Sequence, residues 1–174
     1  MKRLILFDRD GTLIEHVHHL VRISQIRFIP GVEEALQKLQ RAGFRFAIAT
    51  NQSVIERGLC STEEVELANN HIANYFRGFD VSFDFIRYCP HMEISDCRCR
   101  KPKIGMVEDI VNSGNYQISS SFMVGDSPSD IEFGYNLGLK TVFIGTLAKS
   151  KTTPTYSIPH ISKLAGAVIE SEIR

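Results

Sequence analysis

Two carboxylates, Asp8 and Asp10, stand one residue apart directly after the apolar run at residues 4–7. Such a short run is typical of a strand buried on both faces of a parallel sheet, and open α/β sheets bind ligands at the carboxyl ends of their strands. We therefore expect both carboxylates to face one crevice, with Gly11 turning the chain. The pair suits a nucleophile and a general acid. Taken alone, an Asp-Gly turn is also typical of an ordinary loop.

Further polar residues stand at the ends of later strand-like runs or in the loops beside them. They are Thr50, Asn51, Arg100, Lys101 and Asp126. Because the carboxyl ends of parallel strands meet at one edge of a sheet, we expect these side chains to converge on the crevice of Asp8 and Asp10. The set meets the needs of phosphoryl transfer from a phosphate monoester, where positioning and charge neutralisation supply most of the catalysis.

Each of these residues has a chemical role to fill. A carboxylate that attacks a phosphate dianion is repelled by about 4 kcal/mol per pair of unit charges, at about 4 Å and an effective dielectric constant of about 20. Mg²⁺ held by Asp8, the main-chain carbonyl of Asp10 and Asp126 would offset this repulsion. Lys101 would add positive charge, and the Thr50 hydroxyl would donate to phosphoryl oxygens. Asp8 would form an aspartyl-phosphate, while Asp10 protonates the leaving oxygen and later deprotonates the attacking water.

In this order the segments resemble the four motifs of the haloacid dehalogenase (HAD) superfamily of phosphatases. The matching positions, within a stretch from residue 4 to residue 144, are 8–12, 50–51, Lys101, and 125–126 with Asp130. The resemblance implies the nucleophile, acid/base, phosphate-binding and Mg²⁺-ligand roles given above. It also implies that Asp130 helps to hold the lysine or the water shell of the metal. A catalytically dead scaffold is the alternative, and the joint presence of all four motifs argues against it.

Strand-like runs alternate with helical patterns along the whole chain, which predicts a doubly wound, mainly parallel α/β sheet. Strands are expected at residues 4–7, 44–49, 83–88, 121–124 and 141–144. Helices are expected between Gly31 and Gly43, between Ser61 and Gly78, at 104–111 and at 128–137. After Thr146 the chain has only a short apolar pattern at 164–169, which either finishes the edge of the sheet or covers a helix. We expect one HAD-like Rossmannoid domain over residues 1–174.

Three of the four cysteines lie in one segment together with a histidine. The four residues are Cys89, His91, Cys97 and Cys99. Three thiolates and one imidazole make a complete tetrahedral set, which is typical of a structural Zn²⁺ site. Such a zinc-bound loop would fix the segment that carries Arg100 and Lys101 and aim both cations at the phosphate. A chance disulfide or buried free thiols are the alternatives.

Within the HAD phosphatases, this zinc segment and the Arg100-Lys101-Pro102 that follows it resemble the D-glycero-D-manno-heptose 1,7-bisphosphate 7-phosphatase group, with which histidinol-phosphate phosphatases are grouped. The resemblance implies a set of substrate-binding residues. They are His16, His19, Asn51, Gln52, Ser53, Arg57, Arg100 and Ser127. A solvated polar loop is the alternative for the histidines.

The chain departs from the usual pattern of this group in two loops. Val54 and Glu56 stand where the group usually has Gly and Ala, so we expect a stiffer loop with an added negative charge beside Arg57. The loop after the first motif ends in His19-Leu20-Val21, where Gly-Tyr-Val is common. The intervals 12–30 and 51–101 leave no room for the inserted cap domain of many HAD enzymes, so loops must build the substrate pocket.

The overall charge is balanced, with 20 Lys plus Arg against 20 Asp plus Glu in 174 residues. No global field therefore favours nucleic acid or a membrane surface. A zinc-bearing module that binds nucleic acid or processes its ends is the alternative from another class, and the lack of a basic arm and an aromatic platform argues against it. No run is long enough for a signal peptide or a membrane span, so we expect a cytoplasmic location. We also expect a monomer.

These observations predict a Mg²⁺-dependent phosphatase with a structural Zn²⁺ that acts on a small phosphorylated metabolite. The resemblance favours removal of the terminal phosphate from a sugar bisphosphate, with D-glycero-D-manno-heptose 1,7-bisphosphate as the leading substrate. Histidinol phosphate is the second candidate.

Overall fold

A six-stranded sheet forms the centre of the computed structural model, which describes residues 1–146 and 152–171. The strands are β1 (Arg3–Phe7), β2 (Phe44–Asn51), β3 (Phe83–Cys89), β4 (Phe122–Gly125), β5 (Lys140–Ile144) and β6 (Tyr156–Ile158). Their order in the sheet is β3-β2-β1-β4-β5-β6, and every neighbouring pair is parallel. The predicted parallel α/β architecture is confirmed.

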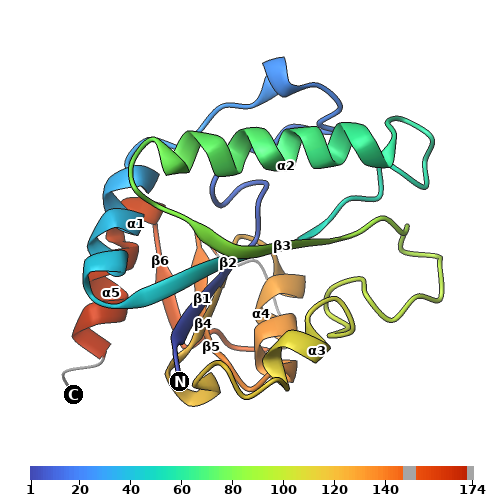
Figure 1. Cartoon of the computed structure of the whole chain (residues 1–174). Helices are drawn as coiled ribbons and strands as arrows, with labels where there is room; N and C mark the ends of the chain where they lie inside the picture. The colour runs from blue at the N-terminus through green and yellow to red at the C-terminus, as the bar shows by residue number, and fades with distance from the viewer. Residues whose placement is uncertain (147–151, 172–174) are drawn as a thin grey trace.

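Helices cover both faces of the sheet (Figure 1). One face carries α1 (Val32–Arg41), α2 (Thr62–Arg77) and α5 (Leu164–Ser171). The other carries α3 (Glu108–Val111) and α4 (Pro128–Asn136). The described residues also form three short 3₁₀ helices, at Ile23–Gln25, Ile118–Ser120 and Ile161–Lys163.

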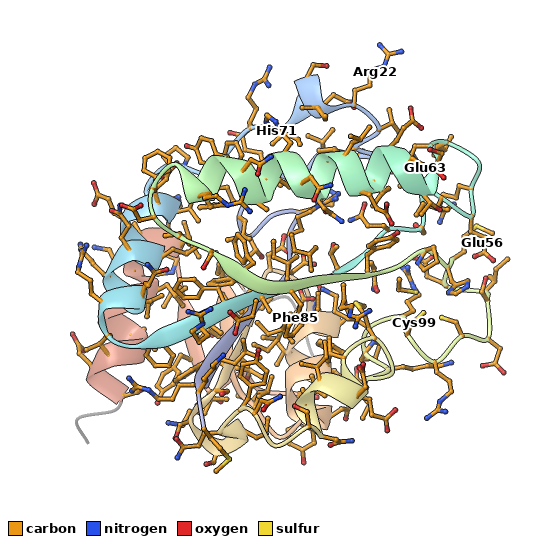
Figure 2. The ribbon with its side chains drawn as sticks, viewed as in Figure 1. Arg22, Glu56, Glu63, His71, Phe85 and Cys99 are labelled. Carbon is orange, nitrogen blue, oxygen red and sulfur yellow. The ribbon has the colours of Figure 1, made fainter. Side chains whose placement is uncertain are left out.

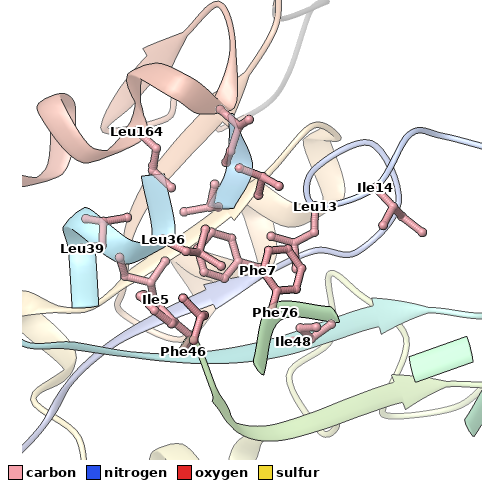
Figure 3. Packing of buried hydrophobic residues seen from close by; sticks show 14 of the residues in the cluster. Ile5, Phe7, Leu13, Ile14, Leu36, Leu39, Phe46, Ile48, Phe76 and Leu164 are labelled. Atoms are coloured by element: carbon pink, nitrogen blue, oxygen red, sulfur yellow. The ribbon is translucent and has the colours of Figure 1, made fainter. Parts of the chain in front are cut away.

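The side chains of β1 alternate between the two cores. Ile5 and Phe7 pack with the core under α1, α2 and α5 (Figure 3), whereas Leu4 and Leu6 pack with the core under α3 and α4. All four side chains are fully buried, and burying an apolar side chain of this size stabilises a fold by about 1.5–3 kcal/mol. This burial on both faces fixes the strand that leads into Asp8.

Capping residues set the starts of α2 and α4. The Ser61 hydroxyl accepts a hydrogen bond from Glu64 N at 3.2 Å, and Ser61 N donates to Glu64 Oε2 at 2.8 Å, so α2 begins with a capping box. At α4, Ser127 N donates to Asp130 Oδ2 at 3.1 Å, and Pro128 takes the first helical position. The capping residue of α4 is thereby one of the predicted site residues.

The helix expected at 104–111 is wrong in its first half. Only Glu108–Val111 is helical, because the preceding residues fold into turns against the cysteine loop. Gly105 N donates to Arg98 O at 3.0 Å, and a Cβ on Gly105 would lie 2.6 Å from that oxygen. The apolar residues of this segment thus face the core from turns, which periodicity alone does not distinguish from a helix.

Two strands extend further than expected. β2 continues through Thr50 and Asn51, because they pair with Tyr88 and Cys89 of β3. β4 includes Gly125. The strands therefore carry the predicted motif residues at their last positions.

The C-terminal part of the chain both finishes the edge of the sheet and covers a helix, the two alternatives that the sequence left open. β6 pairs with β5 and extends the sheet, and α5 packs against α1 with Leu164, Ala165 and Val168 buried. Residues 147–151 of the stretch after Thr146 lie outside the described residues. Among the described helices, none combines the length and apolar character needed to cross a membrane.

Candidate active site

The crevice lies where the strand order reverses, between β1 and its neighbour β4, which is where open α/β sheets bind ligands. Asp8 follows β1 and Asp126 follows β4, and Asp8 N donates to Val124 O at 2.9 Å. A cavity of about 290 Å³ opens here. Its lining residues are Asp8, Asp10, His16, Thr50, Asn51, Arg100, Lys101, Asp126, Ser127, Ser129 and Asp130. The structure thus brings all the predicted catalytic residues together.

Lys101 lies at the floor of this cavity with its side chain 2% exposed. Its ammonium group donates to Asp8 Oδ1 at 2.6 Å and to Ala49 O at 2.8 Å. It lies 2.6 Å from Asp130 Oδ1 as well. Burial alone would lower the pKa of Lys101, but the adjacent Asp130 and Asp8 raise it above its ordinary value. Lys101 therefore stays protonated and holds positive charge in the site.

Asn51 holds the backbone of Lys101. Lys101 N donates to Asn51 Oδ1 at 3.0 Å, and Asn51 Nδ2 donates to Lys101 O at 3.3 Å. The end of β2 thereby fixes the loop that carries the lysine. This contact gives Asn51, which the sequence suggested for substrate binding, a role in the scaffold.

Three carboxylates crowd beside Lys101. One oxygen from each of Asp8, Asp126 and Asp130 lies within 4.8 Å of the other two. Burial raises the pKa of Asp8 to about 7 against the lowering effect of Lys101, and burial with the charge of Asp130 raises the pKa of Asp126. The site thus holds more negative charge than one lysine offsets. Clustered carboxylate oxygens are the ligands that Mg²⁺ prefers, so the donor set fits this cation.

Gly11 lets the loop after β1 pass directly over Asp126. Its φ of 80° lies in the left-handed region, and a Cβ there would lie 2.0 Å from Asp126 Oδ2. Only glycine meets both conditions without strain. The Asp-Gly turn is therefore part of the site and not an ordinary loop.

The carboxylate of Asp10 is not part of this cluster and has hydrogen-bond partners of its own. It accepts hydrogen bonds from Arg9 Nε at 2.9 Å and from Gln52 Nε2 at 2.9 Å. Gln52 is 5% exposed and was predicted to bind substrate, whereas Arg9 was not predicted to have a role. The signal for Arg9 was present in the sequence as a charged residue between two motif carboxylates at the end of a buried strand.

A second cavity of about 290 Å³ adjoins the first. Its lining residues are Asp10, His16, Val17, His18, His19, Leu20, Asn51, Gln52, Ser53, Val54, Arg57 and Glu93. Asp10, His16 and Asn51 line both cavities. Apart from Arg100 and Ser127, which line the first cavity, every residue predicted to bind substrate lines the second. Loops build its walls, as expected for a chain without a cap.

Glu93 lies between two arginines at the rim of the second cavity. Arg57 Nη2 lies 3.2 Å from Glu93 Oε2, and Arg100 donates to Glu93 Oε1 and, at 2.9 Å, to His91 O. Sequence reasoning missed Glu93, because an acidic residue in an exposed loop carries no pattern. The contacts join the loop after β2 to the cysteine loop.

Glu56 makes a second connection between these loops. Its carboxylate accepts hydrogen bonds from Met92 N and, at 2.6 Å, from Ser95 Oγ. The hydrogen bond from Met92 N holds the pKa of Glu56 below its ordinary value, so this carboxylate is ionised at neutral pH. The added charge predicted beside Arg57 is used to tie the two loops together.

The four predicted zinc ligands meet at the end of β3, which Cys89 closes, and in the loop that follows it, where Figure 2 labels Cys99. Cys89 Sγ lies 3.1 Å from Cys99 Sγ and 3.7 Å from Cys97 Sγ, and His91 Nδ1 lies 3.2 Å from Cys99 Sγ. A tetrahedral site with Zn–S bonds of about 2.3 Å has sulfur–sulfur edges of about 3.8 Å. The cysteines form no disulfides. The cluster has the composition and size of a closed metal site.

Known proteins share this fold and sequence pattern. The family model described as haloacid dehalogenase-like hydrolase matches residues 12–144. The D-glycero-beta-D-manno-heptose-1,7-bisphosphate 7-phosphatase of Pasteurella multocida is 38% identical over 154 residues, which cover 84% of this chain and 83% of that protein. The histidine biosynthesis bifunctional protein HisB of Legionella pneumophila is 35% identical over 141 residues, or 80% of this chain and 40% of HisB. This chain therefore spans about two fifths of the length of HisB.

A solved structure agrees with these relatives. The D,D-heptose 1,7-bisphosphate phosphatase from B. bronchiseptica, complexed with magnesium and phosphate, matches with a TM-score of 0.84 and 25% identity over 97% of this chain and 99% of that one. The resemblance predicted from the motifs is confirmed. Because the family model covers most of its length, the chain belongs to the haloacid dehalogenase-like hydrolases.

Proposed function

We propose that this protein is a Mg²⁺-dependent phosphatase that removes the terminal phosphate from a sugar bisphosphate through an aspartyl-phosphate on Asp8. The observation that carries the proposal is the placement of Lys101 Nζ 2.6 Å from Asp8, with Asp126 and Asp130 alongside, at the switch point of the sheet. The leading substrate is D-glycero-D-manno-heptose 1,7-bisphosphate. The sequence relative from Pasteurella multocida and the solved structure from B. bronchiseptica support this choice.

Asp8, Asp126 and the main-chain carbonyl of Asp10 would hold the magnesium ion, with Asp130 supporting Lys101. When bound, the cation supplies positive charge that offsets the repulsion between a carboxylate and a phosphate dianion. Lys101 supplies a permanent positive charge beside Asp8. The Thr50 hydroxyl and nearby backbone amides would donate to the phosphoryl oxygens.

The reaction takes two steps on this chain. In the first, a carboxylate oxygen of Asp8 attacks the phosphorus, the bond to the ester oxygen breaks, and the carboxyl group of Asp10 gives its proton to that oxygen. In the second, a water attacks the phosphorus and gives a proton to the Asp10 carboxylate. The bond between the phosphorus and Asp8 breaks, which releases inorganic phosphate and restores both carboxyl groups.

The second cavity would take the organic part of the substrate. Arg57 lines this cavity and Arg100 lines the adjoining first one, and both suit a second phosphate because guanidinium groups bind phosphate through paired hydrogen bonds. His16, His19 and Ser53 would contact sugar hydroxyls, and Ser127 would contact the substrate from the first cavity. The HisB relatives favour histidinol phosphate as the second candidate substrate.

We also propose a structural Zn²⁺ held by Cys89, His91, Cys97 and Cys99. The closed donor set leaves no position for a substrate, so the ion would act by fixing the loop before Arg100 and Lys101. We further infer a single domain over residues 1–174 that acts as a cytoplasmic monomer, without nucleic acid or membrane. The balanced charge of the sequence argues against binding to nucleic acid or to a membrane surface.

Substrate comparison tests the proposal. We expect kcat/KM for the heptose bisphosphate to exceed that for histidinol phosphate and for simple sugar monophosphates, and equal low rates on all three would remove the heptose assignment. Asp8→Asn should abolish turnover and leave the melting temperature nearly unchanged, because Lys101 keeps its contact with Asp130, whereas Asp109→Asn, at an exposed acid, should retain both. A tenth of the activity left in Asp8→Asn would exclude Asp8 as the nucleophile.

A further inference from the structure

Arg9 is a buried charge for which the reaction above has no use. Its side chain is 1% exposed, and among the described residues it heads the fully buried side chains by volume. A charge in a protein interior is costly unless it is paired and hydrogen-bonded. Its placement between Asp8 and Asp10 therefore needs an explanation.

All three nitrogens of the Arg9 guanidinium have partners. Nε donates to Asp10 Oδ2 at 2.9 Å and Nη2 to Asp10 Oδ1 at 3.2 Å, so the contact with Asp10 is bidentate. Nη2 also donates to Gln52 Oε1 at 2.8 Å, and Nη1 donates to Asn69 Oδ1 at 2.9 Å. The arginine thus connects the loop after β1 with the loop after β2 and with α2.

Gln52 and Asn69 complete a cradle for the carboxylate. Gln52 Nε2 donates to Asp10 Oδ2 and to Thr50 Oγ1, each at 2.9 Å. Asn69 is 5% exposed and lies on the buried face of α2 among apolar residues. Buried amides are retained where they have partners, and here the partner of each is Arg9. Both oxygens of Asp10 are held in one orientation as a result.

This orientation places Asp10 at the junction of the two cavities, since its side chain lines both. A phosphate ester with its phosphorus beside Asp8 and its organic part in the second cavity has its ester oxygen at that junction. The ester oxygen is the atom that must receive a proton as the bond to phosphorus breaks. Arg9, Gln52 and Asn69 therefore hold the Asp10 carboxyl group next to the position of the ester oxygen.

We propose that Arg9, Gln52 and Asn69 are positioning residues that fix the Asp10 carboxyl group for proton transfer to the ester oxygen. The inference rests on the proposed phosphatase function. It predicts a dependence on the leaving group, because an alkoxide is a strong base that needs a proton to depart, whereas a nitrophenolate departs without one. A residue that merely stabilises the fold would affect both kinds of ester alike.

The test compares kcat/KM of the full-length, Mg²⁺-loaded protein for β-glycerophosphate and p-nitrophenyl phosphate. kcat/KM reports only the steps up to release of the leaving group. The later proton transfer from water to Asp10 therefore does not affect it. For Arg9→Met, we expect the value for the alkyl ester to fall about 100-fold, in the range of a lost general acid, and the value for the aryl ester to change less than about threefold. Arg9→Lys should restore part of the loss.

If Arg9→Met does not fold, Asn69→Ala provides the test. This variant removes one hydrogen bond to Arg9 and keeps the hydrogen bonds that Arg9 and Gln52 donate to Asp10. In this variant, kcat/KM for the alkyl ester should fall about tenfold, and kcat/KM for the aryl ester should change little. Asn70→Ala, at the exposed neighbouring position, should leave kcat/KM for both esters unchanged. Equal losses on both esters, or no loss on either, in a folded Asn69→Ala variant would overturn the proposal. If the wild-type protein hydrolyses neither these two esters nor the heptose bisphosphate and histidinol phosphate, the proposed function itself fails.

Discussion

Lys101 Nζ lies 2.6 Å from Asp130 Oδ1, and both side chains are buried. Asp130 also accepts hydrogen bonds from Ser127 N at 3.1 Å and from Ser127 Oγ at 2.7 Å at the start of α4. The same carboxylate therefore caps a helix and holds the lysine. This contact joins the loop before α3 to the helix after β4 and fixes both on the crevice.

Replacing Lys101 with Met should cost stability as well as activity. The change leaves Asp8 and Asp130 buried without their shared positive charge, and breaking a buried ion pair costs about 3–5 kcal/mol. Denaturant unfolding should show this loss, and phosphatase turnover should disappear. Lys38→Met, on the exposed side of α1, should change the unfolding free energy by less than about 0.5 kcal/mol. A Lys101→Met variant as stable as the wild type would contradict the pairing.

Gly11→Ala should abolish activity through contact and not through backbone strain. The new Cβ would lie 2.0 Å from Asp126 Oδ2, so the loop or the carboxylate must move, and a displacement of about 1 Å costs about 100-fold in rate. Gly114→Ala is a matched control, because its φ of 75° is similar and a Cβ there meets no atom within 4 Å. Both variants should lose stability through the strained φ, Gly11→Ala should lose more because of the close contact, and only Gly11→Ala should lose turnover. Equal activity in the two would show that the close approach to Asp126 is unimportant.

Cys99→Ser should release bound zinc and loosen the loop before Lys101. Elemental analysis of the wild-type protein should find about one zinc per chain, as one closed four-ligand site requires. Cys60→Ser should keep that zinc, since Cys60 lies outside the cluster. Wild-type protein that contains no zinc would reject the site. Loss of zinc without any change in turnover would show that the metal is not needed to position Arg100 and Lys101.

The crevice was predictable because strand ends in a parallel sheet converge. Asp8 and Asp126 follow buried apolar runs that can be recognised in the sequence. The order of the sheet places those two runs side by side. The cysteines and His91 were predictable from chemistry alone. Their meeting required only a short loop.

Other contacts were not predictable, because they depend on how loops and helices pack. Ile104 suggested a helix, but the turns around Gly105 place it against the core without one. Glu93 has no pattern around it, and only the fold brings it between Arg57 and Arg100. Asn69 interrupts an apolar helix face, which is a signal of a buried partner, but its partner Arg9 is distant in sequence.

A last prediction concerns the end of the sheet away from the crevice, where Asp84, near the start of β3, contacts Arg45 near the start of β2 and two residues outside the strands, Lys2 and Tyr116. It accepts hydrogen bonds from Arg45 Nε at 2.9 Å and from the Tyr116 hydroxyl at 3.0 Å, and Lys2 Nζ lies 3.9 Å away. Burial alone would raise the pKa of Asp84, but the hydrogen bonds from Arg45 and Tyr116 outweigh it and hold the pKa below its ordinary value.

The lowered pKa of Asp84 makes stability fall at acid pH. The carboxylate contributes its full stabilisation above the pKa of the unfolded chain, about 3.9, and loses it as the pH falls through the lower folded value. Asp84→Asn should therefore be less stable than the wild type by about 1.5–3 kcal/mol at pH 7, with the difference narrowing toward pH 3. Urea unfolding at several pH values measures this. Asp96→Asn, at a fully exposed acid, should follow the wild-type curve, and turnover should stay unchanged in both variants because Asp84 lies far along β3 from the crevice. A constant difference between Asp84→Asn and the wild type at every pH would mean that the ionisation of Asp84 contributes nothing.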